Sequence, residues 1–406
     1  MTLPSEKEVE GSSQKSSTIG RKYLFLILTL SFMVNFDSTV AIPIIANYAV
    51  ELGATITLTA FIVGVYSMIH IPSNIFFGRL VDKFGRKRLI AIGMFLDGIS
   101  MFLYFLATDP MFLLFARLIH GLGGGFGGPA TMAYLSDATS QKRSGRGMAL
   151  YGISIGFANL IGFMLGGMVA QIIGYSNLFL IIAIVLFLLS FLSFGLPSIY
   201  QPREAGIPFK EELKILKQTI FRKSMISPYF SAIALMFNMG IVTATYTVML
   251  KTASYTDGQI GMILSIMVIF SILVHYPAGI LSDKIGYIKV MLIGLLFIAL
   301  TFGILIISLE PPIPMIGMVF FGLGHGLIFP STAGVIKEKT PDSESGIATG
   351  MFYALIVAGV AIGAPISGLI YEISTAQITL LLGIFSPLIV VFILICLLRN
   401  SKNVKQ

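Results

Sequence analysis

Long apolar stretches alternate with short polar segments along almost the whole chain. Twelve such stretches follow a polar first segment, and each approaches or exceeds the ~20 residues that a helix needs to cross a bilayer. They cover 23–47, 56–78, 89–107, 111–135, 146–172, 177–197, 226–250, 258–281, 288–308, 314–335, 346–371 and 377–398. This pattern predicts an all-α membrane protein with twelve transmembrane helices.

The longest polar segment inside the chain divides these helices into two groups of six. In this segment Phe209, Leu213, Leu216 and Ile220 recur at helical spacing, which predicts an amphipathic helix lying along the membrane surface. The expected organisation is a disordered tail, a six-helix bundle, a linker, a second six-helix bundle and a short tail, at 1–20, 21–197, 198–225, 226–398 and 399–406.

The two groups of six are related in sequence at an offset of 201 residues. The stretch "GRLVDKFG" at 78–85 matches "GILSDKIG" at 279–286, with glycine, leucine, aspartate, lysine and glycine at corresponding places. Parallel half-repeats of this kind place a substrate site at their shared interface, near the middle of the membrane.

Charge is scarce, and its distribution predicts the orientation. Only 11% of the residues are charged, against about 25% in soluble domains. With twelve spans, 25 of the 27 lysines and arginines fall on one side of the membrane. The positive-inside rule makes that side cytoplasmic, so both termini are expected in the cytoplasm of a cell-membrane protein. The net charge of +8 therefore indicates the lipid bilayer, and not nucleic acid, as the partner.

The segment between spans 2 and 3, "GRLVDKFGRKR", concentrates charge and predicts a gate. Gly85 permits a tight turn, and Arg86 and Lys87 anchor the segment on the inner side. Asp82 lies at the end of a helix where the macrodipole disfavours an acid, so it needs a partner. That partner is either the loop's own cations or the start of span 11. The predicted gate contains Gly78, Asp82, Gly85, Arg86, Lys87, Asp283 and Gly286.

This stretch and its second copy resemble the loop signature of the major facilitator superfamily. Two further segments resemble those of its proton-coupled drug antiporters: "RLIHG" at 117–121, where His120 replaces a usual glutamine, and "GFMLGG" at 162–167, where Phe163 replaces a usual proline. The context of Asp37, "NFDSTVAIP", is also similar. The resemblance implies helix-packing roles for Gly121, Gly162, Gly166, Gly167 and Pro365.

Ionisable residues in mid-membrane are candidate functional groups. Histidines aside, the spans contain Asp37, Asp97 and Arg117. Asp37 lies ~22 Å from the inner end of span 1 and Arg117 ~10 Å from the outer end of span 4, so the two depths agree within a turn. We therefore predict an Asp37–Arg117 pair that couples transport to protons, with His120 as a further proton carrier. The alternative is a static ion pair, and Asp97 is interpreted as a structural acid.

The C-terminal half has no charge in mid-span, so the predicted cavity is mainly apolar and small-polar. Its expected lining includes Asn35, Asn238, Tyr246 and His325. No group of histidines, cysteines or acids has the sequence spacing of a metal site, and no cofactor is expected beyond the proton gradient.

These features predict a secondary active transporter, and no enzyme, that works by alternating access on a small-molecule substrate. Absence of a Gly-Lys dipeptide excludes a P-loop pump. The resemblance favours proton-coupled efflux of moderately hydrophobic or cationic compounds by a monomer. The alternative is a proton symporter that takes up a sugar or an organic acid.

Overall fold

The computed structural model describes residues 20–138, 144–198, 214, 217–218, 222–341 and 345–403, and all regular structure within these ranges is helical. They contain twelve helices long and apolar enough to cross a membrane, which confirms the predicted fold class. The first half contains α2 (Arg21–Ala41), α4 (Ile56–Phe84), α5 (Arg86–Leu106), α6 (Pro110–Ala138), α7 (Ser144–Ile173) and α8 (Tyr175–Ser193). The second contains α10 (Ile226–Ile241), α12 (Asp257–Ile285), α13 (Tyr287–Leu305), α14 (Ile313–Lys339), α15 (Ser345–Ile373) and α16 (Ala376–Asn403).

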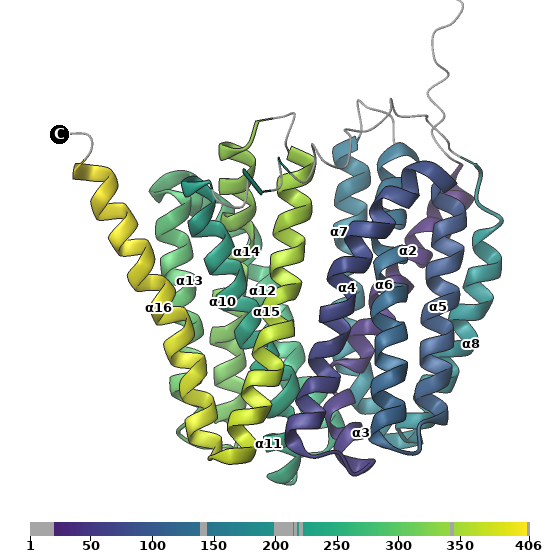
Figure 1. Cartoon of the computed structure of the whole chain (residues 1–406), viewed down its shortest axis with the longest axis horizontal. Coiled ribbons are helices and arrows are strands. Elements are labelled where there is room, and N and C mark those ends of the chain that lie inside the picture. Colours follow the sequence, from purple (N-terminus) through teal and green to yellow (C-terminus); the bar gives the residue numbers. More distant parts are fainter. Residues whose placement is uncertain are drawn as a thin grey trace, which may run out of the picture.

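The two groups of six helices lie side by side as two bundles (Figure 1). Within the first bundle α5 packs between α6 and α8, and within the second α13 packs between α14 and α16. Two helix pairs carry most of the contact between the bundles: α4 lies against α15, and α7 lies against α12. The interface is therefore formed by equivalent helices of the two halves.

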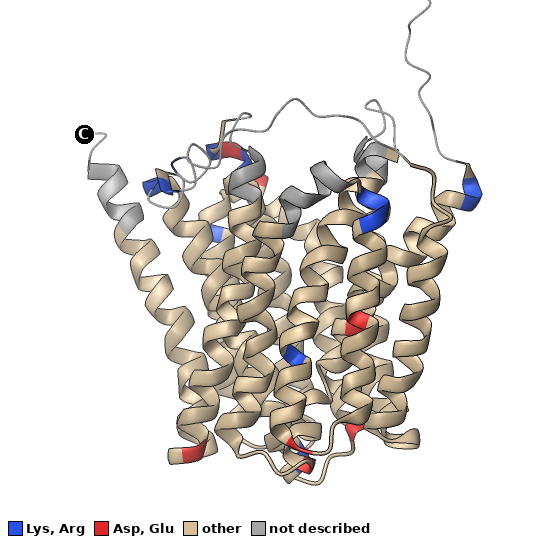
Figure 2. Cartoon of the chain, turned by 45° about the vertical axis from the view of Figure 1, so that its right-hand side comes forward, with Lys and Arg blue, Asp and Glu red and all other residues tan. Residues whose placement is uncertain are grey.

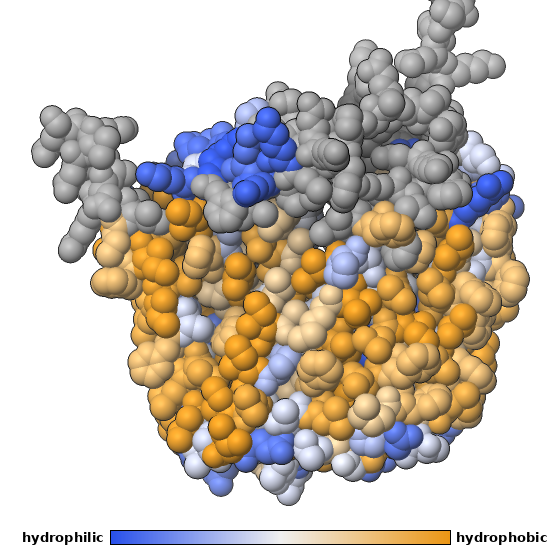
Figure 3. Space-filling view, in the orientation of Figure 1, coloured by the Kyte–Doolittle hydropathy of each residue, from blue (hydrophilic) through white to orange (hydrophobic). Residues whose placement is uncertain are grey.

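The two ends of the bundle differ in charge. We call the end at which α2 begins and α16 ends the upper end, and the opposite end, with the short helices α3 (Ile45–Glu51) and α11 (Thr247–Thr252), the lower end. Among the described residues most lysines and arginines lie at the upper end (Figure 2). Between the two ends the visible surface is a broad apolar band, as lipid contact requires (Figure 3).

The charged segment between spans 2 and 3 is helical rather than a loop. α4 continues to Phe84 and α5 begins at Arg86, so Gly85 alone joins them. Gly85 has φ 83° and ψ 140°, and Gly286, which alone joins α12 to α13, has φ 92° and ψ 142°. Residues with side chains rarely adopt a positive φ, which explains glycine at both junctions. The shared geometry shows the half-repeat directly.

The predicted first span needs correction, and the seventh contains an irregularity. The stretch 23–47 is not one helix: α2 ends at Ala41, and α3 begins at Ile45. Pro43 lies in the break, where it has no N–H to donate to a continuing helix. The seventh span contains a π-helical turn, η4 (Val242–Tyr246), between α10 and α11. The predicted linker helix at 198–225 lies largely outside the described residues.

Candidate functional site

Asp37 lies about one turn before the C-terminal end of α2 and is fully buried, with 0% of its surface exposed. Its Oδ1 accepts hydrogen bonds from the backbone N–H of Ser38 at 2.6 Å and from the Ser38 hydroxyl at 3.2 Å. Its Oδ2 lies 3.5 Å from Nε2 of His120, which is also 0% exposed. Among the described residues, His120 is the basic side chain within 4.0 Å of this carboxylate.

The predicted direct pair of Asp37 with Arg117 is therefore wrong in this structure, because His120 lies between them. Arg117 Nη1 donates to Nδ1 of His120 at 3.2 Å and to the Tyr104 hydroxyl at 3.3 Å. Its guanidinium carbon lies 4.7 Å from the centre of the Tyr66 ring, a cation–π contact. Arg117 and His120 are three residues apart on α6, so they share one face of that helix.

The hydrogen bonds determine which nitrogen of His120 carries hydrogen. Nδ1 of His120 lies 2.9 Å from the Tyr104 hydroxyl and 3.2 Å from Nη1 of Arg117. The guanidinium can only donate and the hydroxyl can donate as well, so both contacts are favourable when Nδ1 carries no hydrogen and accepts. In the neutral ring Nε2 then carries the hydrogen, and Nε2 lies 3.5 Å from Asp37 Oδ2, a close contact that is not a formed hydrogen bond. Arg117, His120 and Asp37 thus form a continuous chain of polar contacts.

Asp97 joins this chain, which the sequence reasoning did not foresee. One ligand atom from each of Asp37, Asp97 and His120 lies within 4.8 Å of the others, and all three residues are buried. Neither carboxylate oxygen of Asp97 has a hydrogen-bond partner in the described part of the chain. The interpretation of Asp97 as a structural hydrogen-bonding acid is therefore wrong. We call Asp37, Asp97 and His120 the acid cluster.

Glycine provides the space for the acid cluster. A Cβ atom built on Gly123 of α6 would lie 2.1 Å from Oδ1 of Asp97. The Asp97 carboxylate therefore occupies room that any larger residue at position 123 would fill. Spacing along the sequence could not reveal the acid cluster, because α2, α5 and α6 each contribute one member.

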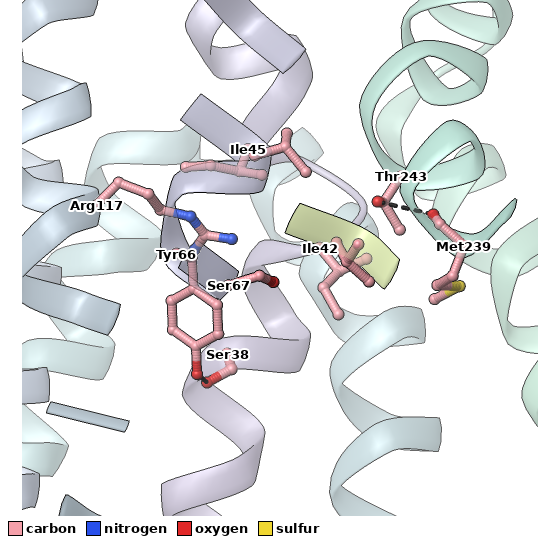
Figure 4. Close-up of a pocket in the computed structure, with 10 residues that line it drawn as sticks. Ser38, Ile42, Ile45, Tyr66, Ser67, Arg117, Met239 and Thr243 are labelled. Carbon is pink, nitrogen blue, oxygen red and sulfur yellow. Dashed lines mark hydrogen bonds between the residues drawn. The ribbon is translucent and has the colours of Figure 1, made fainter. Parts of the chain in front are cut away.

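A small cavity of about 120 Å³ lies beside the acid cluster, between the two halves. Figure 4 shows Arg117, Tyr66 and Ser38 on one side of it, with Met239 and Thr243 of the other half opposite. The remaining lining residues are mostly apolar: Ile42, Ile45, Val63, Ser67 and Val360. The Tyr66 and Ser38 hydroxyls lie 3.1 Å apart. Arg117 thus faces the cavity and also contacts the acid cluster.

The residues predicted to line the cavity lie elsewhere. Asn238 donates to Ser386 Oγ of α16 at 2.9 Å, so it faces away from the half-to-half interface. His325 lies 2.7 Å from the Ser271 hydroxyl, Tyr246 is buried in η4, and Asn35 donates to the Ser31 carbonyl of its own helix. Ser38, Tyr66 and Thr243 take their place in the lining.

The gate residues are only partly described. Gly78 and the Asp82 side chain lie outside the part of the chain whose side chains are described. Gly85 and Gly286 form the two single-residue junctions, Arg86 is buried at the start of α5, and Lys87 follows it. Asp283 accepts a weak hydrogen bond from the Tyr287 hydroxyl at 3.5 Å, across the second junction. The gate stays a prediction.

At the lower end, polar contacts join the two halves. Asp257, the first residue of α12, accepts a hydrogen bond from Asn47 of α3 at 3.2 Å and an ion pair from Lys251 at 2.6 Å. The backbone N–H of Thr57 in α4 donates to the carboxylate of Glu372 in α15 at 2.6 Å. Sequence reasoning missed these contacts. Two of the 27 lysines and arginines do not fall on the predicted cytoplasmic side: Arg117 lies inside a span, and Lys251 lies at the outer end of span 7.

Glycines allow the helices to approach closely at the same end. A Cβ on Gly167 of α7 would lie 2.0 Å from the Asp257 carbonyl oxygen of α12. Across the other contact between the halves, Pro365 lies against Gly64, whose added Cβ would be 2.9 Å away. Added Cβ atoms on the other three predicted packing glycines would meet neighbouring helices within 3 Å: Gly121 at Tyr66, Gly162 at Thr39 and Gly166 at Val40.

The chain was compared with known proteins. The sequence profile of the Major Facilitator Superfamily matches residues 27–250 and 228–406. An uncharacterized MFS-type transporter of Methanocaldococcus jannaschii is 26% identical over 363 residues, which cover 87% of this chain and 92% of that protein. The multi-drug resistance efflux pump PmrA of Streptococcus pneumoniae is 22% identical over 355 residues, 83% of this chain and 87% of PmrA.

Two further similarities extend over nearly the whole chain. The quinolone resistance protein NorB of Staphylococcus aureus is 24% identical over an alignment that covers 100% of both chains. A crystal structure of nucleoside transporter NupG superposes with a TM-score of 0.76 at 17% identity, over 92% of this chain and 98% of that one. At that identity the likeness shows the fold alone. The chain belongs to the Major Facilitator Superfamily: it is a twelve-helix integral membrane transporter of small molecules that resembles multidrug efflux pumps.

Proposed function

We propose that the protein exports moderately hydrophobic, neutral or cationic organic compounds across the cell membrane in exchange for protons. The observation that carries this proposal is that Arg117 contacts both the cavity and the acid cluster. Its guanidinium lines the cavity between the halves, and its Nη1 donates to His120, which faces Asp37. Events in the cavity are thereby connected to a buried carboxylate.

The contact chain suggests how substrate and proton exclude each other. A compound entering the cavity displaces the Arg117 side chain, which changes its hydrogen bond to His120 Nδ1. That change alters the donor that faces Asp37 and therefore the ease with which the buried carboxylate holds a proton. Each ligand thus lowers the affinity for the other, as exchange requires.

The lining supports the proposed class of substrate. Aliphatic side chains supply most of it, and a few hydroxyls supply the polar contacts. Tyr66 presents an aromatic ring beside these groups. Such a surface suits a compound with a large apolar part, because a sugar or a polyanion needs several hydrogen bonds or cations. The described lining contains a single cation, Arg117.

The polar contacts at the lower end support alternating access. They hold α3 and α4 of the first half against α12 and α15 of the second, so the lower end is closed in this conformation. The distribution of lysines and arginines supports the assignment of the upper end to the cytoplasm, with both termini on that side. Opening the lower end then requires these contacts to break.

The test is proton flux in liposomes that carry the purified protein and an internal pH dye. With an acidic lumen, addition of an exported compound should release protons in the wild type and not in Asp37→Asn. Glu310→Gln, an exposed acid in the lower loop before α14, is the matched control and should behave as the wild type.

Two other results would contradict the proposal. Full proton release in Asp37→Asn, with the variant correctly folded, would remove Asp37 from coupling. Movement of protons in the same direction as a sugar or an organic acid would identify a symporter, with Arg117 as the group that binds the acid.

A further inference from the structure

We propose that Asp97 is the second carboxylate of a one-proton site, in which Asp37 and Asp97 bind a single proton as a pair beside His120. This inference deepens the proposed function, on which it rests, because it names the residue that shares the coupling proton and limits that site to one proton per cycle.

The balance of charge is the first argument. Asp37, Asp97, His120 and Arg117 are each buried, with Arg117 the most exposed at 4%. Nδ1 of His120 accepts from Arg117, so the imidazole is neutral in the observed arrangement. Two carboxylates and one guanidinium then leave one negative charge in a region where an uncompensated charge is strongly disfavoured. One added positive charge makes the group neutral.

The unpartnered atoms are the second argument. Both oxygens of Asp97 and Oδ2 of Asp37 lack a hydrogen-bond partner in the described part of the chain. Buried polar atoms are normally satisfied. A proton on one carboxyl turns an acceptor into a donor directed at its neighbours, so it relieves the repulsion between the acids and supplies a missing hydrogen bond.

The surroundings of Asp97 offer no other charge to do this. α5 packs mainly against α6 and α8, and α8 contains no acid, base or histidine. The other titratable groups near the pair are Tyr66 and His70 of α4, Tyr104 of α5, and His120 and Arg117 of α6. Among these side chains Arg117, already counted, is the one with a permanent charge.

A proton fits this site better than a metal ion does. The acid cluster supplies three ligand atoms, and the neighbouring Arg117 guanidinium repels a metal ion, which keeps its charge when bound. A proton does not keep its charge, because it turns the carboxylate that it joins into a neutral carboxyl group. Binding of a divalent ion would also change the net charge of the two carboxylates and the guanidinium from one negative to one positive. Mn²⁺ binding is nevertheless a distinct outcome that the experiment can detect.

The experiment is pH-difference infrared spectroscopy of the purified protein, which observes protonated buried carboxyls without any substrate. We expect one carboxylic-acid equivalent in the wild type. A shared proton predicts its complete loss in both Asp97→Asn and Asp37→Asn, since either change leaves the remaining acid balanced by Arg117. Independent acids predict that one variant keeps the whole signal, and that result would overturn the proposal.

A second variant guards against misfolding of Asp97→Asn. Gly123→Ala keeps all charges but places a methyl group where the Asp97 carboxylate lies, so it should displace that carboxylate and reduce the signal. Gly128→Ala in the same helix is the control, because a Cβ there meets nothing within 4 Å. Equal signals in the two alanine variants would count against a role for Asp97.

Metal binding and transport separate the remaining cases. If Mn²⁺ abolishes the carboxyl signal and binds the wild type but not Asp97→Asn, the cluster is a metal site and the one-proton proposal fails. If the infrared result is as expected but the liposomes show no proton exchange, the proposed function fails and the shared-proton site stands. If exchange occurs and Asp97→Asn retains its full pH dependence, only the role of Asp97 fails.

Discussion

His120 is the residue on which the contact chain depends. It accepts from Arg117 at Nδ1 and faces Asp37 with Nε2, so it connects a cavity residue to a buried acid. The related drug antiporters usually have a glutamine at this place, whose amide also offers one acceptor and donors. The connection therefore requires a side chain with both functions rather than an imidazole as such.

This comparison gives a prediction for two substitutions of His120. His120→Gln should keep proton-driven transport within about threefold of the wild type, because the glutamine amide can accept from Arg117 with its oxygen and direct an N–H toward Asp37. His120→Ala should lose about tenfold or more, since a hydrogen bond to a charged group contributes ~1.5–3 kcal/mol. Initial rates in liposomes under a fixed pH gradient measure both. Equal losses in the two variants would show that the ring itself carries the proton.

Arg117 allows a second prediction at the same scale. Arg117→Lys preserves the charge but replaces the planar guanidinium, whose Nη1 contacts both Tyr104 and His120, by a shorter side chain that ends in an ammonium group. We expect the binding of a cationic test compound to change by less than about threefold, while proton release on binding falls by about tenfold or more. Calorimetry in two buffers of different ionisation enthalpy measures both quantities. Proton release that falls only in step with binding would contradict the connection.

Among the helices, the α7–α12 contact controls the lower end. Gly167 of α7 lies so close to the start of α12 that a Cβ atom on it would lie 2.0 Å from the Asp257 carbonyl oxygen. Asp257 itself bridges Asn47 of the first half and Lys251 of the second. Close approach and polar bridging therefore occur at the same point, and a change in helix spacing there must disturb both.

A methyl group on Gly167 should consequently weaken closure of the lower end. For Gly167→Ala we expect transport slowed by about tenfold, in line with the ~1–3 kcal/mol that overpacking costs. Hydrogen exchange should become faster at the start of α12 and in α3. Gly152→Ala, in the same helix but with nothing within 4 Å of the added Cβ, serves as the control. Unchanged exchange in Gly167→Ala would mean that the contact is not part of the closed state.

For the whole molecule, the even number of spans and the uneven charge determine the expected orientation. The orientation can be measured with single cysteines in a Cys396→Ser background. One variant is Arg88→Cys, at an exposed position of the upper end, and the other is Glu310→Cys, at an exposed position of the lower end. In intact cells an impermeant thiol reagent should label position 310, and position 88 only after permeabilisation. Labelling of position 88 in intact cells would reverse the direction of the proposed transport.

Sequence periodicity was sufficient for the helices because each span is a local apolar pattern. The twelve helices and the two glycine junctions follow from residues close together in the chain. The charged segment at 78–88 was mistaken for a loop because charge ends a membrane span without ending a helix, and α4 continues beyond the apolar run.

The candidate site could be predicted only in part. Depth along a helix brought Asp37 and Arg117 to one level, but the direction in which each helix faces is set by packing. His120 therefore occupies the position between them, and Asp97, interpreted from the sequence as a structural acid, joins the group. A useful signal was available: Asp97 is a carboxylate inside a span, and such residues are costly unless they have a function.

The junctions at Gly85 and Gly286 have a mechanical consequence. A connection of one residue leaves no slack, so α5 must follow any tilt of α4, and α13 must follow α12. Because α4 and α12 are among the helices that meet the opposite half, motion at the interface is transmitted to the outer layer of each bundle. A fluorescent label on the lipid-facing side of α5 or α13, far from the cavity and harmless to it, should therefore report every transport cycle.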